Sequence, residues 1–174
     1  MERLVNALRQ GRRVPPRSVV LTFDDGWENQ FRYALPILMQ YDFTATFFIF
    51  TNAIGRPHFL SWEQVATMDK VGMTIGGHTR FHPDLIKIKD PELLKKEIID
   101  SKKIIESHLL KPTNLFAYPF GQYNDVIISV VKEAGYTAAR GIHAGTNHVA
   151  KNLYTLTGVE ATDDLNKFIK DLTI

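Results

Sequence analysis

The chain contains no cysteine, no long apolar run and no marked excess of either charge. Without cysteine it has neither disulfide bonds nor thiolate metal ligands. No apolar run approaches the ~18 residues of a membrane-spanning helix, and the N-terminus lacks the apolar segment of a signal peptide. A formal net charge of +2 is too small to indicate a nucleic-acid partner. These absences leave a globular protein as the interpretation.

The overall composition of the chain is ordinary for a globular protein. Hydrophobic residues make up 44% and charged residues 23% of the 174 positions. This length predicts a single domain over residues 1–174. A chain of this size buries ~70% of the surface that its unfolded form exposes, so it can build a sizeable core.

Segments rich in β-forming residues alternate with segments of helical pattern. The predicted strands are 18–23, 45–51, 73–78, 114–120, 137–142 and 153–159, and the predicted helices are 28–41, 61–72, 90–110, 124–134 and 163–171. Ser61 opens its helix with a capping box, Asp90 is an N-cap, and Pro36 predicts a kink. This alternation predicts a parallel α/β sheet, either open and doubly wound or closed into an incomplete (β/α) barrel.

Polar residues follow the strands at the end where both architectures bind ligands. Asp24 and Asp25 follow the first predicted strand, His78 ends the third, and Pro119 lies at the end of the fourth. Adjacent carboxylates repel each other, and burial penalises their charged form. The two aspartates are therefore either solvated turn residues before Gly26 or the neighbours of a cation.

The segment "HTRFH" places His78 and His82 four residues apart, a spacing typical of metal ligands. Pro83 disfavours helical geometry at His82, so we expect a loop after the strand. With an aspartate, the two histidines form a three-ligand set with an open position, as in metal hydrolases. One aspartate could bind the metal while the other accepts a proton from water. His58 and His108, taken singly, are interpreted as structural.

Three motifs in order, "TFDDG", "HTRFHPDL" and "FAYPFGQYN", resemble the polysaccharide deacetylases of the NodB-homology type, carbohydrate esterase family 4. "ATFFIF", "SWEQVATM" and "GMTIGGHT" extend the resemblance from about Arg13 to Val159. It implies a distorted, incomplete (β/α) barrel, a carbohydrate polymer or oligomer as substrate, and release of acetate. It also implies a divalent metal, Zn²⁺ or else Co²⁺, Ni²⁺ or Fe²⁺, and an extracytoplasmic or cell-surface setting.

By motif position, the resemblance implies roles for individual residues. Asp24 would be the general base, and Asp25, His78 and His82 the metal ligands. Residues 116–121 would form one wall of the substrate groove, with the backbone N–H of Phe120 holding the oxyanion. The candidate substrate-binding residues are Trp27, Tyr118, Pro119, Phe120, Gly121 and Tyr123, of which Trp27 and Tyr123 could stack on a sugar. Trp62 is assigned to the core or to a helix start.

The chain departs from the family pattern at two places. Many members have an arginine where this sequence has Ala117, and no Leu-x-His motif, which usually supplies the general acid, follows Val159. The third motif instead resembles the branch that acts on poly-N-acetylglucosamine, in which the acid comes from an upstream segment. The acid would therefore come either from a segment N-terminal to this chain or from His143 or His148 inside it.

Three interpretations of function stay open. The leading one is a metal-dependent N-deacetylase of an N-acetylglucosamine-containing polysaccharide or oligosaccharide. The second is the same chemistry on another amide or ester, such as acetylated xylan. The third is a non-catalytic sugar-binding domain that retains the metal, favoured by the missing histidine. Asp24 speaks against the third, because a domain that only binds needs no general base.

Overall fold

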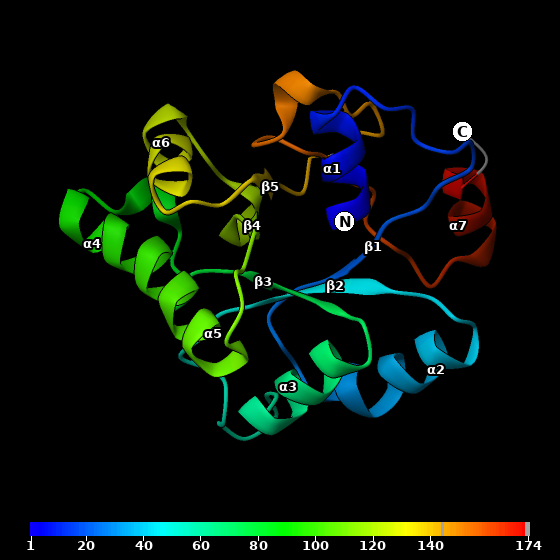
Figure 1. Ribbon diagram of the computed structural model, residues 1–174, viewed down its shortest axis with the longest axis horizontal. Helices are drawn as coiled ribbons and strands as arrows, with labels where there is room; N and C mark the ends of the chain where they lie inside the picture. Colours follow the sequence, from blue (N-terminus) through cyan, green and yellow to red (C-terminus); the bar gives the residue numbers. More distant parts are fainter. Residues whose placement is uncertain (144, 173–174) are drawn as a thin grey trace.

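The computed structural model describes residues 1–143 and 145–172. Its parallel strands form one sheet, in the order β1 (Leu21–Phe23), β2 (Ala45–Ile49), β3 (Thr74–Gly77), β4 (Leu115–Ala117) and β5 (Ala138–Arg140). Strands that follow one another in the sequence are neighbours throughout, whereas a doubly wound sheet reverses its order. The sheet curls into a half-barrel surrounded by helices (Figure 1), which confirms the predicted distorted, incomplete (β/α) barrel.

Helices fill most of the connections between strands. The α-helices are α1 (Glu2–Arg9), α2 (Leu35–Gln40), α3 (Trp62–Lys70), α4 (Pro91–Lys95), α5 (Ser101–Leu109), α6 (Asp125–Glu133) and α7 (Leu165–Leu172). Two segments are π-helical. One, η1 (Gln30–Ala34), leads into α2, and the other, η3 (Lys96–Asp100), joins α4 to α5. Short 3₁₀ turns are η2 (Leu85–Lys87), η4 (Pro119–Gly121) and η5 (Ala150–Asn152). None of the described helices is long and apolar enough to cross a membrane.

The helix signals in the sequence act as expected. Ser61 and Gln64 form the predicted capping box of α3, and the Asp90 side chain accepts a hydrogen bond at the start of α4. Asn124 accepts one from the Ile127 N–H at the start of α6. A π-helical turn precedes α2 at the position of the predicted Pro36 kink, because proline lacks the N–H that would continue regular α-helical bonding.

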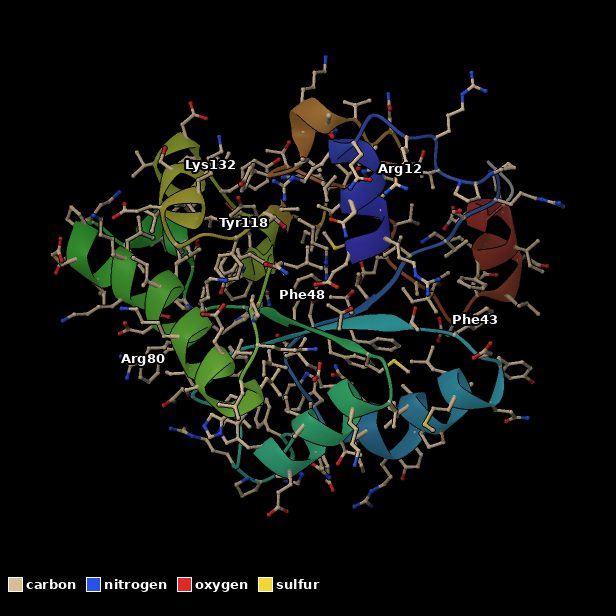
Figure 2. All side chains as sticks on the ribbon, in the orientation of Figure 1. Arg12, Phe43, Phe48, Arg80, Tyr118 and Lys132 are labelled. Atoms are coloured by element: carbon tan, nitrogen blue, oxygen red, sulfur yellow. The ribbon has the colours of Figure 1, made fainter. Side chains whose placement is uncertain are left out.

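Apolar clusters cover both faces of the curled sheet. Outside, α2, α3 and α5 pack against β2 and β3 around Phe47, and α6 packs around Phe116. Inside the curl, Val5 of α1 packs with Phe48 and Leu115. Figure 1 shows α1 on one side of β2 and β3, with α2 and α3 on the other, and Figure 2 shows Phe48 among the strands. The carboxyl ends of the strands remain available to build a site.

One expectation about secondary structure was wrong, and one helix was not predicted. The sixth strand, 153–159, is reduced to one bridge, in which Leu156 pairs with Arg140. Turn residues occupy the start of that segment, where the Thr155 N–H donates to the Asn152 carbonyl, so too few residues are left in extended geometry. The helix α1 was missed, because its N-cap Met1 makes no side-chain capping bond that a pattern could indicate. The other strands form within their predicted ranges but are shorter.

Candidate metal centre

Asp25, His78 and His82 lie together at the carboxyl ends of β1 and β3. Asp25 Oδ1 is 3.6 Å from His78 Nε2 and 3.4 Å from His82 Nε2, and the two Nε2 atoms are 3.1 Å apart. Ligand atoms bound at about 2.0–2.2 Å to a tetrahedral zinc ion lie roughly 3.3–3.5 Å from one another. The donor set and its spacing therefore fit a divalent metal ion.

His78 is held in the form that a metal requires. The side chain is buried, and its Nδ1–H donates to the Ala117 carbonyl over 2.7 Å, which leaves the Nε2 lone pair directed at Asp25 and His82. Burial lowers the pKa of His78, although the nearby carboxylates of Asp24 and Asp25 act in the opposite direction. A neutral imidazole with a fixed tautomer is a ready metal ligand.

The two oxygens of Asp25 have different surroundings. Oδ2 accepts a hydrogen bond from the Trp27 indole N–H over 3.2 Å, while Oδ1 faces the histidines. The Asp25 backbone has φ 75°, and the following Gly26 has φ 77°. A Cβ on Gly26 would lie 3.0 Å from Ile49 Cγ2, so only glycine fits this turn without strain. The left-handed turn directs the Asp25 carboxylate toward the centre.

His82 follows a tightly anchored loop, as Pro83 predicted. The His82 N–H donates to Thr79 Oγ1 over 3.0 Å, and both residues have left-handed φ values of 58° and 70°. The backbone N–H groups of Arg80 and Phe81 donate to one oxygen of Glu97, over 3.1 and 2.9 Å. The Glu97 side chain is buried and comes from the π-helical segment η3. The sequence pattern of its helix gave no sign of this role.

Asp24 is paired with an arginine that the sequence analysis missed. Asp24 Oδ1 forms an ion pair with Arg140 Nη2, and the Asp24 carbonyl accepts a hydrogen bond from the side-chain amide of Gln30. The guanidinium also lies 5.2 Å over the Phe48 ring. Many family members have an arginine at the position of Ala117 on β4. In this chain Arg140, the register partner of Ala117 on the neighbouring strand β5, supplies a guanidinium to the site. A charged residue inside the predicted strand 137–142 was the available signal.

The third motif borders the centre through the Ala117 carbonyl, which bonds His78, and through the Phe120 ring. Phe120 has φ 56° within η4, its ring is 54% exposed, and the ring centroid lies 4.8 Å from that of His82. Tyr118 is buried, and its hydroxyl donates to the Tyr154 carbonyl over 3.0 Å. A Cβ on Gly121 would lie 2.3 Å from Ile142, so this turn requires glycine. Of these candidate substrate-binding residues, Phe120 offers the exposed side chain.

The remaining third-motif candidates and the candidate acids lie farther along this edge. Pro119 is buried, whereas Tyr123 is half-buried, with its ring centroid 4.8 Å from Tyr118 and 6.1 Å from His143. His143 is exposed. Burial lowers the pKa of His148, which favours its neutral form. The His143 ring contacts the Tyr123 ring, and the His143 carbonyl accepts a hydrogen bond from the Gly158 N–H.

The other aromatic and histidine residues of the sequence analysis have structural contacts. Trp62 is the first residue of α3 and stacks on His108, with ring centroids 3.8 Å apart. The carbonyl of His58 accepts a hydrogen bond from the Glu28 N–H over 2.9 Å. Trp27 is 41% exposed and stacks on Phe59, with ring centroids 4.3 Å apart. Trp27 is thus the tryptophan that borders the metal centre.

The chain resembles known proteins both in sequence and in fold. A family model described as polysaccharide deacetylase matches residues 11–139. A poly-beta-1,6-N-acetyl-D-glucosamine N-deacetylase of Staphylococcus aureus is 29% identical in an alignment of 163 positions that covers 86% of this chain and 56% of that protein. The chain thus spans just over half the length of the curated relatives that it matches.

Solved structures with the same fold extend the comparison to the whole chain. The Streptococcus pyogenes deacetylase PplD, solved in complex with acetate, superposes with a TM-score of 0.93 at 28% identity, over 99% of this chain and 77% of that one. IcaB from Ammonifex degensii superposes with a TM-score of 0.89 over 97% of this chain and 78% of that one. At 23% identity, the likeness to IcaB is one of fold alone.

Proposed function

Because the chain belongs to the polysaccharide deacetylase family, we propose that it is a metal-dependent hydrolase that removes N-acetyl groups from an N-acetylglucosamine-containing polysaccharide or oligosaccharide. The observation that carries this proposal is the Asp25–His78–His82 set with the Asp24–Arg140 ion pair beside it. The Staphylococcus aureus relative, named for its action on poly-N-acetylglucosamine, supports the substrate class.

Asp25, His78 and His82 would hold the metal. When bound, a divalent ion lowers the pKa of a water molecule to about 7 and polarises the acetamide carbonyl. Zn²⁺ is the first candidate, because two imidazoles and a carboxylate are a typical donor set for catalytic zinc. Co²⁺, Ni²⁺ and Fe²⁺ accept the same ligands and are the alternatives. The fixed tautomer of His78 supports this role.

Asp24 would act as the general base that takes a proton from the attacking water. Its Oδ1 is paired with Arg140 Nη2, which leaves Oδ2 to accept the proton. The Gln30 side chain fixes the Asp24 carbonyl from the other side of the turn. Arg140 is therefore a positioning residue in this proposal: it orients the base and takes no proton itself, because its guanidinium stays charged.

Two further steps complete the hydrolysis. Attack on the acetamide carbonyl puts negative charge on its oxygen, and the Phe120 N–H would donate to it, a contribution of ~3 kcal/mol for one such donor. The C–N bond then breaks, and the departing amine takes a proton as acetate is released. His143 is the candidate donor, since it is exposed beside Tyr123, whereas the lowered pKa of His148 favours its neutral form.

The test is acetate release from N-acetylglucosamine oligomers by the protein reconstituted with zinc, cobalt or nickel. We expect turnover that needs both the metal and Asp24. Asp24→Asn should lose turnover while it keeps the metal, and Asp25→Asn should lose the metal as well. If acetate were released only from acetylated xylan, the substrate would be an acetylated xylan and not an N-acetylglucosamine oligomer. Metal and oligomer binding without acetate release would identify a sugar-binding domain and overturn the proposal.

A further inference from the structure

The outer face of α2 is apolar and carries no charge. Of the α-helices that the structure describes, α2 alone contains no charged residue. Leu35 and Leu38, on its inner face, are buried in the core. Tyr33, Ile37 and Tyr41 lie on the other face and are 63%, 56% and 63% exposed. Because the outer face of a surface helix normally carries charged or polar residues, this face indicates that something covers it.

The exposed apolar side chains form one continuous stripe. Tyr33, Ile37 and Tyr41 follow one another at four-residue intervals, which makes them neighbours on a helix surface. The Tyr41 N–H donates to the Ile37 carbonyl over 3.2 Å, so the helical spacing holds to the end of the stripe. The Tyr41 and Phe43 ring centroids are 6.5 Å apart, so Phe43 extends the surface past the helix. We call these four residues the α2 stripe, and Figure 1 shows α2 at the outer edge of the fold.

The sequence of this face is symmetric about Ile37. In "RYALPILMQYD" a tyrosine stands four positions before Ile37 and another four positions after it, and the two ends are Arg32 and Asp42, of opposite charge. If two copies of α2 lie antiparallel about a two-fold axis at Ile37, Tyr33 of each copy meets Tyr41 of the other. Arg32 of each copy then lies near Asp42 of the other. A two-fold symmetric interface requires such reciprocal contacts.

Charge and area both favour a second copy as the occupant. Arg32 Nη2 pairs with Glu28 of its own chain, but the side chain is 61% exposed and a guanidinium has five N–H donors, so it can also bind the Asp42 carboxylate of a second copy. The α2 stripe exposes roughly 450 Å² of apolar surface. A standard interface buries about 800 Å² of each partner, a little over half of it apolar. The stripe therefore supplies the apolar part of one such interface.

We propose that the α2 stripe is the interface of a two-fold symmetric dimer, in which the α2 helices of two copies pack antiparallel with Ile37 at the axis. Interfaces of this size have Kd values in the micromolar range or tighter. Above that concentration, the protein should have twice the 19.8 kDa mass of one chain. The inference does not rest on the proposed function, because association is measured without substrate.

Sedimentation velocity measures the mass, and a matched pair of variants locates the interface. Ile37→Glu would place two carboxylates against each other at the axis, so it should raise the Kd of the dimer by about 10- to 100-fold. Val126→Glu is the control, because Val126 is also an exposed aliphatic residue but belongs to α6. This control should leave the Kd unchanged.

Cysteine cross-linking tests the antiparallel arrangement. The chain has no cysteine, so each substitution introduces the only thiol. Under mild oxidation Ile37→Cys should form a disulfide-linked dimer, because a residue at the axis meets its own counterpart, and Val126→Cys should not. A mixture of Tyr33→Cys and Tyr41→Cys should cross-link more than either variant alone, since the proposed pairing joins position 33 of one copy to position 41 of the other.

The outcomes decide between this interface and the alternatives. A doubled mass that Ile37→Glu reduces and Val126→Glu does not, with the expected cross-links, supports the dimer. A protein that stays monomeric well above the micromolar range, with no cross-link in Ile37→Cys, overturns it. A dimer that survives Ile37→Glu would place the contact elsewhere and also overturn it. If the monomer instead binds vesicles of phosphatidylcholine and phosphatidylglycerol, and Ile37→Glu prevents this, the stripe contacts a membrane surface and the dimer is rejected.

Discussion

Replacing Glu97 should weaken metal binding although Glu97 touches none of the proposed ligands. Its buried carboxylate accepts the N–H groups of Arg80 and Phe81, which lie between the two histidine ligands. His82 must hold a left-handed φ of 58° at the end of this loop. Glu97→Ala removes the acceptor of both bonds, so the loop loses the anchor that opposes its backbone strain.

The size of the effect follows from the two hydrogen bonds. A bond to a charged group contributes about 1.5–3 kcal/mol, so the pair contributes about 3–6 kcal/mol at most. Phe81 is 51% exposed, so water can reach this stretch of the loop and the lower end applies. If about 1–2 kcal/mol of this energy orders the loop, metal affinity should fall about 5- to 30-fold, since 1.4 kcal/mol corresponds to a tenfold change. Glu97→Gln keeps a carbonyl acceptor and should lose less.

Glu106, on the adjoining helix α5, provides a matched control. It also accepts a backbone N–H, from Thr113, but at the start of β4, the end of the sheet opposite the site. Zinc affinity would be measured by competition with a chromophoric chelator, and the free energy of unfolding by urea titration of the metal-free protein. Glu97→Ala should lower both quantities and Glu106→Ala only the second. If both variants bind zinc as tightly as the wild type, other contacts order the loop and the reasoning is refuted.

Three further predictions concern the base, the sheet and a helix start. Arg140→Ala should lower kcat by roughly 10- to 100-fold, because Asp24 loses the partner that orients it, and Arg140→Lys should restore part of the activity. Zinc affinity should stay unchanged, and an equal loss of zinc affinity would contradict a role confined to the base. Gly77→Ala should destabilise the fold by about 1–3 kcal/mol in urea unfolding, because its Cβ would lie 2.1 Å from the Tyr136 hydroxyl, and Tyr136→Phe should recover part of that loss. Asn124→Ala should cost about 1 kcal/mol by removing the N-cap of α6, and an unchanged urea midpoint would show that the cap contributes nothing.

Much of the fold could be predicted because its signals are local. The capping box at Ser61, the N-cap at Asp90 and the apolar strand runs each specify structure through neighbours a few residues away. The segment 153–159 has the same β-like composition, yet a turn at Asn152 consumes its first residues. Strand formation depends on pairing along a whole edge, which composition does not specify.

The sequence by itself determined the proposed ligand set and the family. Asp24 beside Asp25, and His78 four residues from His82, indicate a metal site, and the resemblance of the ordered motifs to the family implies which of these residues are the ligands. Only the tertiary structure brought Arg140 of β5 to Asp24, which follows β1 at the other edge of the sheet.

Tertiary structure likewise decided the surroundings of the candidate site. It brought the Glu97 carboxylate to the loop before His82, and the loop 55–59 to the turn at Trp27. Residues far apart in the sequence meet only once the sheet has curled and its helices have packed. A motif fixes which groups are close along the chain, whereas the packed fold decides which other groups orient them.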